Sequence, residues 1–256
     1  MDAKKTPGHG EFQKNFVLTV RAVEYLLGIT LPSLKLKANV NVNLSTNITA
    51  TLGLAGALPP IFPPEVRSVI LEAIPILTKL GIKLALKDLF SFNLKTQAEP
   101  LVTNFMDINW QYNNPANPAD AALGPQIYDN HLYYSFGGVA DPNENAYLTH
   151  ICNLDRIEKD ASLGNAPLYF GEWALPTQFQ ASDAFLRKWA DAQKRAYSQG
   201  AGWIFWNFKV EQPSTARQWS YLEGVKRGYL TRDPSQYNDP RVCDPYVRTS
   251  AAAATS

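Results

Sequence analysis

The six residues Leu168-Tyr169-Phe170-Gly171-Glu172-Trp173 decide the fold class, because they read as a short apolar strand that ends in a carboxylate. A helix is predicted directly after them, with Ser182 as its N-cap and Gly200 just past its end. The inner face of this helix is apolar and consists of Phe185, Leu186 and Trp189. Residues 202–208 then form a second short apolar strand. Short apolar strands that alternate with helices are typical of an α/β fold with parallel strands and outer helices.

The same alternation extends upstream. Residues 126–134 are β-prone and rich in polar groups, and a helix is predicted at about 144–161. Polar groups therefore follow the ends of consecutive strands. This arrangement is typical of the active-site rim of a (β/α)₈ barrel.

Composition excludes several classes of partner. With 24 basic and 23 acidic residues the net charge is +1, so we expect no nucleic-acid partner. No run of roughly 18 apolar residues exists, and we expect no membrane span. The N-terminal residues have no apolar stretch typical of a signal peptide.

The N-terminal segment, residues 1–95, follows a different pattern. Helix-like spacing over 16–26 precedes a strict alternation of apolar and polar residues over 34–54, which predicts an amphipathic β-hairpin. This hairpin is either an ordinary surface element or a cap over a cleft. A helix is expected over 64–80, kinked or interrupted by Pro75. We therefore divide the chain into this segment, a barrel portion over 96–247 and a disordered tail over 248–256.

The two cysteines, Cys152 and Cys243, leave two alternatives open. They would form one disulfide in a secreted protein and stay free in a cytosolic one. Two cysteines cannot form a zinc site of the usual spacing, and no phosphate-binding loop is present. We expect neither a metal nor a cofactor.

Three segments resemble fungal members of glycoside hydrolase family 5. Residues 128–136 are similar to the sixth barrel strand, 168–173 to the seventh, which carries the nucleophile, and 200–211 to the eighth. Residues 219–234 resemble the closing helix and tail of the exo-β-1,3-glucanase branch. The resemblance implies a partial (β/α)₈ barrel, strands six to eight with their helices, behind an atypical N-terminal helix and hairpin.

The resemblance also implies roles for individual residues. Glu172 is the expected catalytic nucleophile, and His131 and Tyr133 are expected to hydrogen-bond the nucleophile and the sugar. Trp206 would be the stacking platform for the sugar. Trp173 and Asn207 are also assigned to substrate binding.

The first half of the family's pattern is not recognisable. The family carries its acid/base on an Asn-Glu pair that ends the fourth strand, whereas Asn143-Glu144 lies after His131, in the wrong order. Glu99, followed by Pro100, is a weak candidate, because only 32 residues separate it from His131. Residues 1–95 do not resemble the first half of the barrel.

Two functions follow from this pattern. The first is an active retaining β-glycoside hydrolase that acts on β-glucan in carbohydrate metabolism. The alternative is a catalytically inactive, carbohydrate-binding or truncated remnant, whose exposed strand edges would favour self-association. The resemblance implies an extracellular or cell-wall location.

Overall fold

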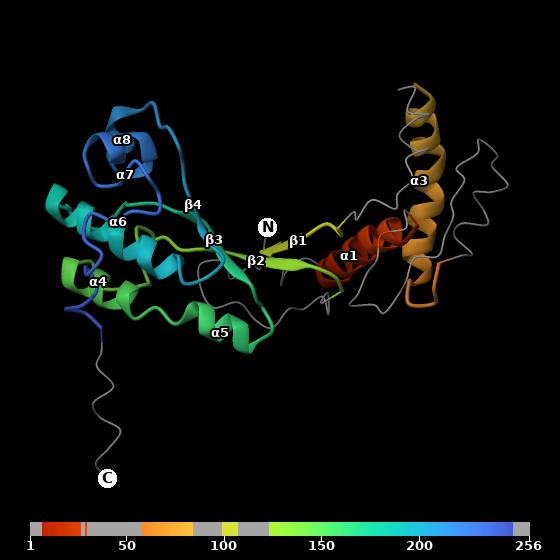
Figure 1. Ribbon diagram of the computed structural model, residues 1–256, viewed down its shortest axis with the longest axis horizontal. Helices are drawn as coiled ribbons and strands as arrows, with labels where there is room; N and C mark the ends of the chain where they lie inside the picture. Colours follow the sequence, from red (N-terminus) through yellow and green to blue (C-terminus); the bar gives the residue numbers. More distant parts are fainter. Residues whose placement is uncertain (1–6, 27–28, 30–57, 84–98, 107–122, 248–256) are drawn as a thin grey trace, which may run out of the picture. The chain divides into compact units, whose positions relative to one another are not determined.

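The computed structural model describes residues 7–26, 29, 58–83, 99–106 and 123–247 (Figure 1). Its helices and strands are, in chain order, α1 (His9–Leu26), α3 (Pro64–Lys83), β1 (Thr103–Met106), β2 (Gln126–His131), α4 (Glu144–Cys152), α5 (Arg156–Ser162), β3 (Leu168–Trp173), α6 (Asp183–Tyr197), β4 (Trp203–Phe205), α7 (Pro213–Trp219) and α8 (Tyr221–Lys226). These four strands form one sheet in the order β1-β2-β3-β4. β3 pairs in parallel with both β2 and β4. The predicted α/β class with a parallel sheet is confirmed.

The chain divides into two compact units. The N-terminal unit comprises residues 1–104 and 117–126, and the C-terminal unit comprises 105–116 and 127–256. The sequence placed the boundary after residue 95, whereas the division passes through β1 and β2. The catalytic candidates Glu172, His131 and Tyr133 all belong to the C-terminal unit.

Aromatic side chains dominate the core of the C-terminal unit. On β3, the Phe170 ring stacks on Tyr197 of α6, with centroids 4.2 Å apart. About two turns earlier in α6, the Trp189 ring contacts Tyr134 and Tyr147 at centroid distances of 4.6 and 5.2 Å. Each such side chain buries roughly 150–250 Å² of surface, so this packing fixes the helices on the sheet.

Helix α6 forms as predicted. The Ser182 hydroxyl accepts a hydrogen bond from the Phe185 backbone N–H at 3.0 Å, which satisfies a donor left free at the helix start. Phe185, Leu186 and Trp189 are all buried. Here the periodicity of the sequence and the observed burial agree.

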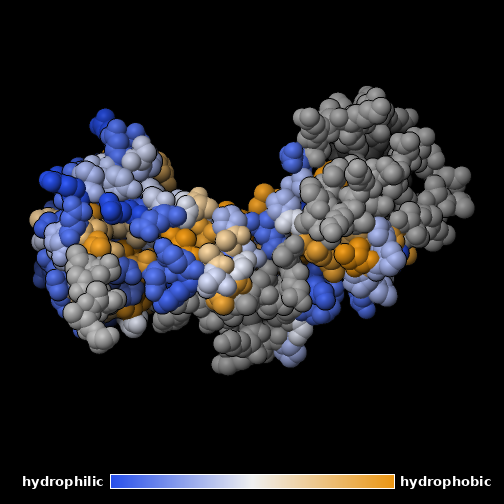
Figure 2. All heavy atoms as spheres, turned by 60° about the horizontal axis from the view of Figure 1, so that its bottom comes forward, coloured by the Kyte–Doolittle hydropathy of each residue, from blue (hydrophilic) through white to orange (hydrophobic). Residues whose placement is uncertain are grey.

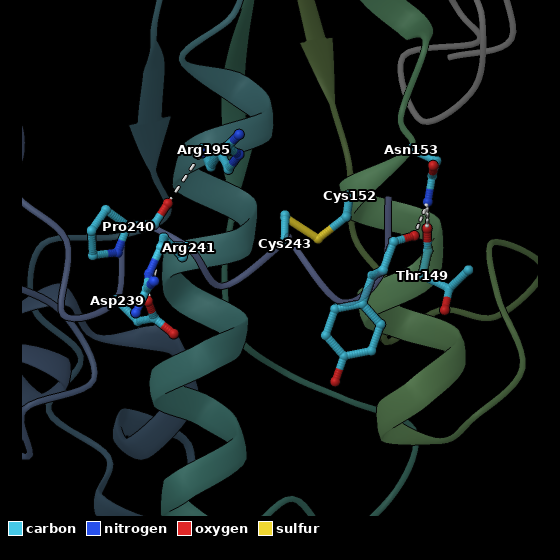
Figure 3. The surroundings of a disulfide bond; sticks show 9 residues. Thr149, Cys152, Asn153, Arg195, Asp239, Pro240, Arg241 and Cys243 are labelled. Atoms are coloured by element: carbon cyan, nitrogen blue, oxygen red, sulfur yellow. Dashed lines mark hydrogen bonds between the residues drawn. A yellow bond between two sulfur atoms is a disulfide. The ribbon is translucent and has the colours of Figure 1, made fainter. Parts of the chain in front are cut away.

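The prediction of a single helix at about 144–161 is wrong, because the structure has two helices, α4 and α5, with a break between them. The Asn153 side-chain amide donates to the carbonyls of Thr149 and Tyr246 at 2.7 and 2.8 Å (Figure 3). A short amide side chain that bonds local backbone competes with helical hydrogen bonds. Asn153 therefore ends α4 and attaches it to the C-terminal tail.

A disulfide joins Cys152, at the end of α4, to Cys243 in the tail, with the two Cα atoms 5.4 Å apart (Figure 3). This settles the alternative that the sequence left open. Arg195 of α6 also donates to the Pro240 carbonyl at 3.1 Å. The tail is therefore held to two helices by separate contacts.

The N-terminal unit has its own apolar core. Leu18 and Ala22 of α1 pack with Val66 and Ile70 of α3, so both predicted helices are confirmed. Of the two effects predicted for Pro75, a kink or an interruption, the interruption is absent, since α3 is continuous from Pro64 to Lys83. A proline removes only one backbone donor, and a helix can continue through it with a bend.

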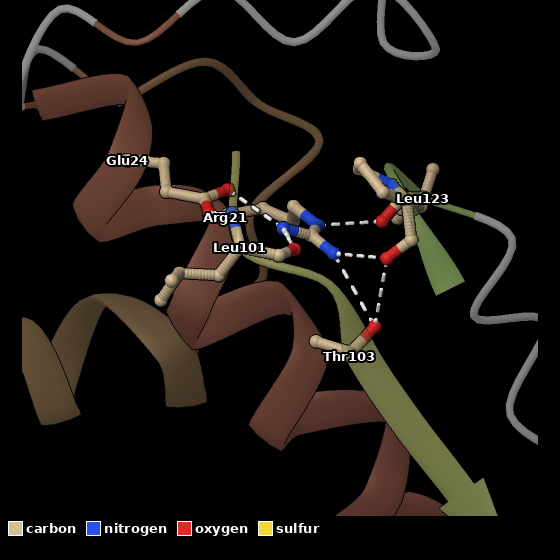
Figure 4. A network of polar contacts seen from close by, with 6 residues as sticks. Arg21, Glu24, Leu101, Thr103 and Leu123 are labelled. Carbon is tan, nitrogen blue, oxygen red and sulfur yellow. Dashed lines mark hydrogen bonds and ion pairs between the residues drawn. The ribbon is translucent and has the colours of Figure 1, made fainter. Parts of the chain in front are cut away.

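A fully buried arginine organises the polar part of the N-terminal unit (Figure 4). Arg21 of α1 forms an ion pair with Glu24 at 2.7 Å and donates to the carbonyls of Leu101, Leu123 and Pro125 at 2.9, 2.6 and 3.0 Å. A buried charge is tolerated only when it is paired and hydrogen-bonded. Arg21 meets this condition and thereby ties α1 to the two chain segments that lead into β1 and β2.

Two sequence predictions lie outside the described residues, namely the hairpin over 34–54 and the tail over 248–256. Of the helices that the structure describes, none is long and apolar enough to cross a membrane.

Replacing both cysteines tests the disulfide. In the chain-entropy model, a crosslink between residues 91 apart restricts the unfolded chain, so Cys152→Ser with Cys243→Ser should lower the free energy of unfolding by about 2–5 kcal/mol. Urea unfolding followed by tryptophan fluorescence measures this. An unchanged midpoint in the double mutant would show that the bridge contributes nothing to the free energy of unfolding.

Candidate active site

The site begins with an irregularity between β2 and β3. Asn130 lies opposite Phe170, but the next pair is His131 opposite Glu172. Gly171 is therefore an extra residue in β3, which makes a β-bulge. Bulges often re-aim a side chain next to an active site.

The bulge reverses the alternation of β3. In a regular strand, residues three apart face opposite sides of the sheet. Phe170 and Trp173 are three apart, yet both rings pack against Tyr197 of α6, at 4.2 and 5.4 Å between centroids. Glu172 is consequently directed to the other face, away from the helix.

Two side chains of the β2 segment contact the Glu172 carboxylate. The Tyr133 hydroxyl donates a hydrogen bond to Oε2 at 3.0 Å, and Nδ1 of His131 lies 3.4 Å from the same oxygen. β2 ends at His131 rather than continuing to Tyr134 as expected, so Tyr133 lies just past the strand. The structure thus brings together the three catalytic candidates that the sequence named.

Tyr133 is held as a hydrogen-bond donor. Burial raises the pKa of its hydroxyl well above the ordinary value, and the hydrogen bond to Glu172 raises it further. The phenol therefore keeps its proton and donates a hydrogen bond to the carboxylate. Its ring contacts Trp219 and Phe136, each at 5.6 Å between centroids.

Asp129 is a second carboxylate near His131. Its Oδ2 lies 3.4 Å from Nε2 of His131, and its Oδ1 accepts a hydrogen bond from the Gly171 N–H at 2.9 Å. Like His131, its side chain is only 12% exposed. The imidazole therefore lies between two carboxylates, those of Asp129 and Glu172.

Trp206 and Asn207 follow β4. The Trp206 N–H donates to the Trp173 carbonyl at 2.8 Å, which keeps the end of β4 beside the end of β3. The strand expected over 202–208 ends at Phe205, because the Asn207 N–H bonds to the Trp219 carbonyl instead of the sheet. The peptide bond between Trp206 and Asn207 is cis.

These two residues differ in what they offer a ligand. The Trp206 side chain is 48% exposed, so its ring is available for stacking. Oδ1 of Asn207 is buried and has no hydrogen-bond partner among the described residues. The substrate-binding roles of Trp206 and Asn207 stay predictions.

Other apolar side chains also reach the surface. The large exposed ones that follow β2 or belong to β4 and its extension are Phe136, Ile204, Trp206 and Phe208. Figure 2 shows hydrophobic side chains at the surface of the described residues. Aromatic rings provide flat apolar surface of the kind that sugar rings stack on.

Trp173 is not a surface residue. We expected it to bind substrate, but it is fully buried, and its ring packs on Phe205 at 4.9 Å between centroids. The bulge at Gly171 is the reason, since it directs Trp173 toward the helix when it directs Glu172 away. Trp173 therefore belongs to the core.

The acid/base candidate Glu99 belongs to the N-terminal unit, and its side chain is exposed. Within the part of the chain that the structure describes, the Glu172 carboxylate contacts the side chains of Tyr133 and His131. The described residues contain no group of three or more His, Cys, Asp or Glu side chains that could hold a metal ion.

Two residues of this site were missed by sequence reasoning. Asp129 precedes His131 by two positions, so strand alternation could have placed both on one face. Trp219 could not have been found in this way, because it reaches Tyr133 from α7, far along the chain. The arrangement as a whole provides a partly exposed carboxylate that accepts a hydrogen bond from Tyr133 and contacts His131, on a sheet whose β4 is followed by an exposed tryptophan.

Comparison with known proteins supports the predicted resemblance. No protein-family model matches the chain. Over 112 residues, 40% of the chain, it is 30% identical to a probable glucan endo-1,6-beta-glucosidase B of Aspergillus flavus. Over 46 residues, 18% of the chain, it is 41% identical to glucan 1,3-beta-glucosidase D of Emericella nidulans. The chain is thus similar to fungal glucan glucosidases.

These matches are partial. The chain covers 26% of the first relative and 5% of the second. Among solved structures, rutinosidase from Aspergillus niger has a TM-score of 0.39 at 20% identity, over 58% of this chain and 41% of that one. AoRut has a TM-score of 0.38 at 17% identity, over 72% of this chain and 57% of that one.

Gly171→Ala tests the bulge. An added Cβ would lie 2.2 Å from Oδ1 of Asp129, so either the carboxylate or the strand must move. We expect the free energy of unfolding to fall by about 1–3 kcal/mol, as for other overpacked sites. Chemical denaturation measures it.

Gly224→Ala is the control for this substitution, because its added Cβ meets the flexible end of the Leu230 side chain. It should cost less. Combining Gly171→Ala with Asp129→Ala should cost less than the sum of the two single changes, since the clash is then removed. Additive costs would exclude a direct contact between the two positions.

Proposed function

We propose that the C-terminal unit is the second half of a family 5 glycoside hydrolase barrel, in which β2, β3 and β4 are strands six, seven and eight. The activity that we propose is retaining hydrolysis of β-glucan. The observation that carries this proposal is the placement of Glu172 at the end of β3, with its carboxylate contacted by Tyr133 at 3.0 Å and His131 at 3.4 Å. The similarity to fungal glucan glucosidases supports the same assignment.

Glu172 would act as the nucleophile. In a retaining glycosidase one carboxylate attacks the anomeric carbon and forms a glycosyl-enzyme, which water then hydrolyses. The hydrogen bond from Tyr133 orients one carboxylate oxygen and leaves the other free to attack. With 29% of its side chain exposed, Glu172 is accessible to a substrate.

Trp206 would supply the apolar platform for the sugar. Its side chain is exposed directly after β4, and its backbone is tied to the end of β3. Because the carboxyl ends of parallel strands meet at one rim, this position supports a stacking role for Trp206 on the rim that carries Glu172. The alternative function, carbohydrate binding without catalysis, uses the same platform and differs only in whether Glu172 reacts.

An extracellular or cell-wall location is part of the proposal. The disulfide between Cys152 and Cys243 supports it, because such bridges persist in oxidising compartments. Self-association through exposed strand edges stays a prediction. Sedimentation of the full chain at several concentrations tests it.

Hydrolysis of dinitrophenyl β-glucoside is the test of the nucleophile. This leaving group departs without protonation, so the assay does not depend on the acid/base. We expect turnover by the wild type and its loss in Glu172→Gln, with covalent labelling of Glu172 by a 2-deoxy-2-fluoro-glucoside detected by mass spectrometry. The matched control is Glu158→Gln, an exposed glutamate of α5.

The two outcomes separate the two functions. Turnover and labelling that require Glu172 would establish a working glycosidase. A wild type that is no faster than Glu172→Gln would exclude the enzyme and leave the alternative, a catalytically inactive carbohydrate-binding or truncated remnant.

The role of Glu99 as acid/base stays a prediction. If it donates the proton, Glu99→Gln should slow hydrolysis of laminarin by about 10²- to 10⁴-fold while sparing formation of the glycosyl-enzyme from dinitrophenyl glucoside. Steady-state rates on both substrates measure this. Equal laminarin rates for wild type and Glu99→Gln would assign the role to another group.

A further inference from the structure

Asp129 uses its two carboxylate oxygens for two different purposes. Oδ1 accepts the hydrogen bond from Gly171 N–H at 2.9 Å, and Oδ2 faces Nε2 of His131 at 3.4 Å. Gly171 directly precedes Glu172 in β3, and His131 lies beside the Glu172 carboxylate. Asp129 therefore acts on the site through other residues.

The first of these contacts stabilises the bulge. The extra residue of a bulge is left out of the regular ladder, so its backbone N–H needs another acceptor. Asp129 provides that acceptor for Gly171. The glycine is required in turn, because any Cβ at this position would lie 2.2 Å from Oδ1 of Asp129. The carboxylate and the missing side chain thus fit each other.

The second contact fixes the imidazole. Nδ1 of His131 lies 3.4 Å from Glu172, and Nε2 lies 3.4 Å from Asp129. A ring with one polar partner can turn about its Cβ–Cγ bond, whereas partners at both nitrogens hold it in one orientation. The partner of one imidazole nitrogen therefore determines whether the other nitrogen is a hydrogen-bond donor or an acceptor.

We propose that Asp129 is a positioning residue for the nucleophile. By holding both the Gly171 bulge and the His131 ring, it fixes the side of the sheet to which Glu172 is directed and the orientation of the imidazole beside it. This inference rests on the proposed function of Glu172. It adds a residue that does not itself touch the reacting atoms.

Asp129→Asn is the informative variant. The amide keeps an oxygen that can accept from Gly171, so the bulge is retained, but an NH₂ group replaces the oxygen that faces His131. Asp191→Asn is the matched control, because Asp191 is also buried and accepts a backbone hydrogen bond, from Asp239 at 2.7 Å. A loss of stability common to both variants can then be separated from an effect on the site.

Two measurements on the whole chain described above test the proposal. The first is the steady-state rate on dinitrophenyl β-glucoside, where Asp129→Asn should lower kcat on the order of 100-fold with KM nearly unchanged, as for a misplaced reacting group. The second is the ¹⁵N chemical shifts of the His131 ring. They should change in Asp129→Asn and stay at wild-type values in Asp191→Asn.

The outcomes are distinct. A wild-type kcat or unchanged His131 shifts in Asp129→Asn would overturn the proposal, as would equal losses in Asp129→Asn and Asp191→Asn. If the wild type has no turnover above Glu172→Gln, the proposed function fails. The His131 shifts then decide alone whether Asp129 holds the ring.

Discussion

One extra residue in β3 determines how the C-terminal unit is built. Because Gly171 is unpaired in the ladder, the residues after it change sides. Trp173 joins Phe170 on the helix side of the sheet, where both contact Tyr197, and Glu172 faces His131. In a regular strand Glu172 would lie on the same side of the sheet as Phe170, and Trp173 would lie on the other side. The tryptophan could then not pack beside Phe170 while the carboxylate faced His131. The bulge allows both, and the core and the site depend on it equally.

The N-terminal unit is held together by a buried arginine as well as by an apolar core. Its apolar core between α1 and α3 is small, and the segments that lead into β1 and β2 carry backbone carbonyls that need donors. Arg21 supplies donors to three of them while Glu24 neutralises its charge. Removing one member of such a buried pair is costly because the other is left charged and unpaired. A charged side chain thus does here what aromatic packing does in the C-terminal unit.

Local sequence patterns predicted the elements that depend on local physics. The Ser182 cap, the apolar face of α6 and the parallel pairing of β3 follow from residues close together in the chain, and the structure has them. The break after Cys152 and the early end of β4 depend on contacts with Tyr246 and Trp219, which periodicity does not reveal. The site shows the same division. His131, Tyr133 and Glu172 were named from the family resemblance of their segments. Trp173 was misplaced, because neighbouring residues of a strand face opposite sides of the sheet and Trp173 packs with Phe170 against Tyr197.

The protonation of the site also limits which chemistry its residues can perform. Among the described residues, the side chains in contact with Glu172 are Tyr133 and His131. The raised pKa of Tyr133 keeps its proton bound, so the phenol donates a hydrogen bond to Glu172 but is itself a poor acid. Asp129 faces His131 and accepts from Gly171, so its oxygens are already engaged. Under the proposed function, in which Glu172 is the nucleophile, neither Tyr133 nor Asp129 is therefore suited to protonating a departing sugar. Substrates whose leaving groups are stable as anions do not need such a proton donor, because these groups depart without protonation.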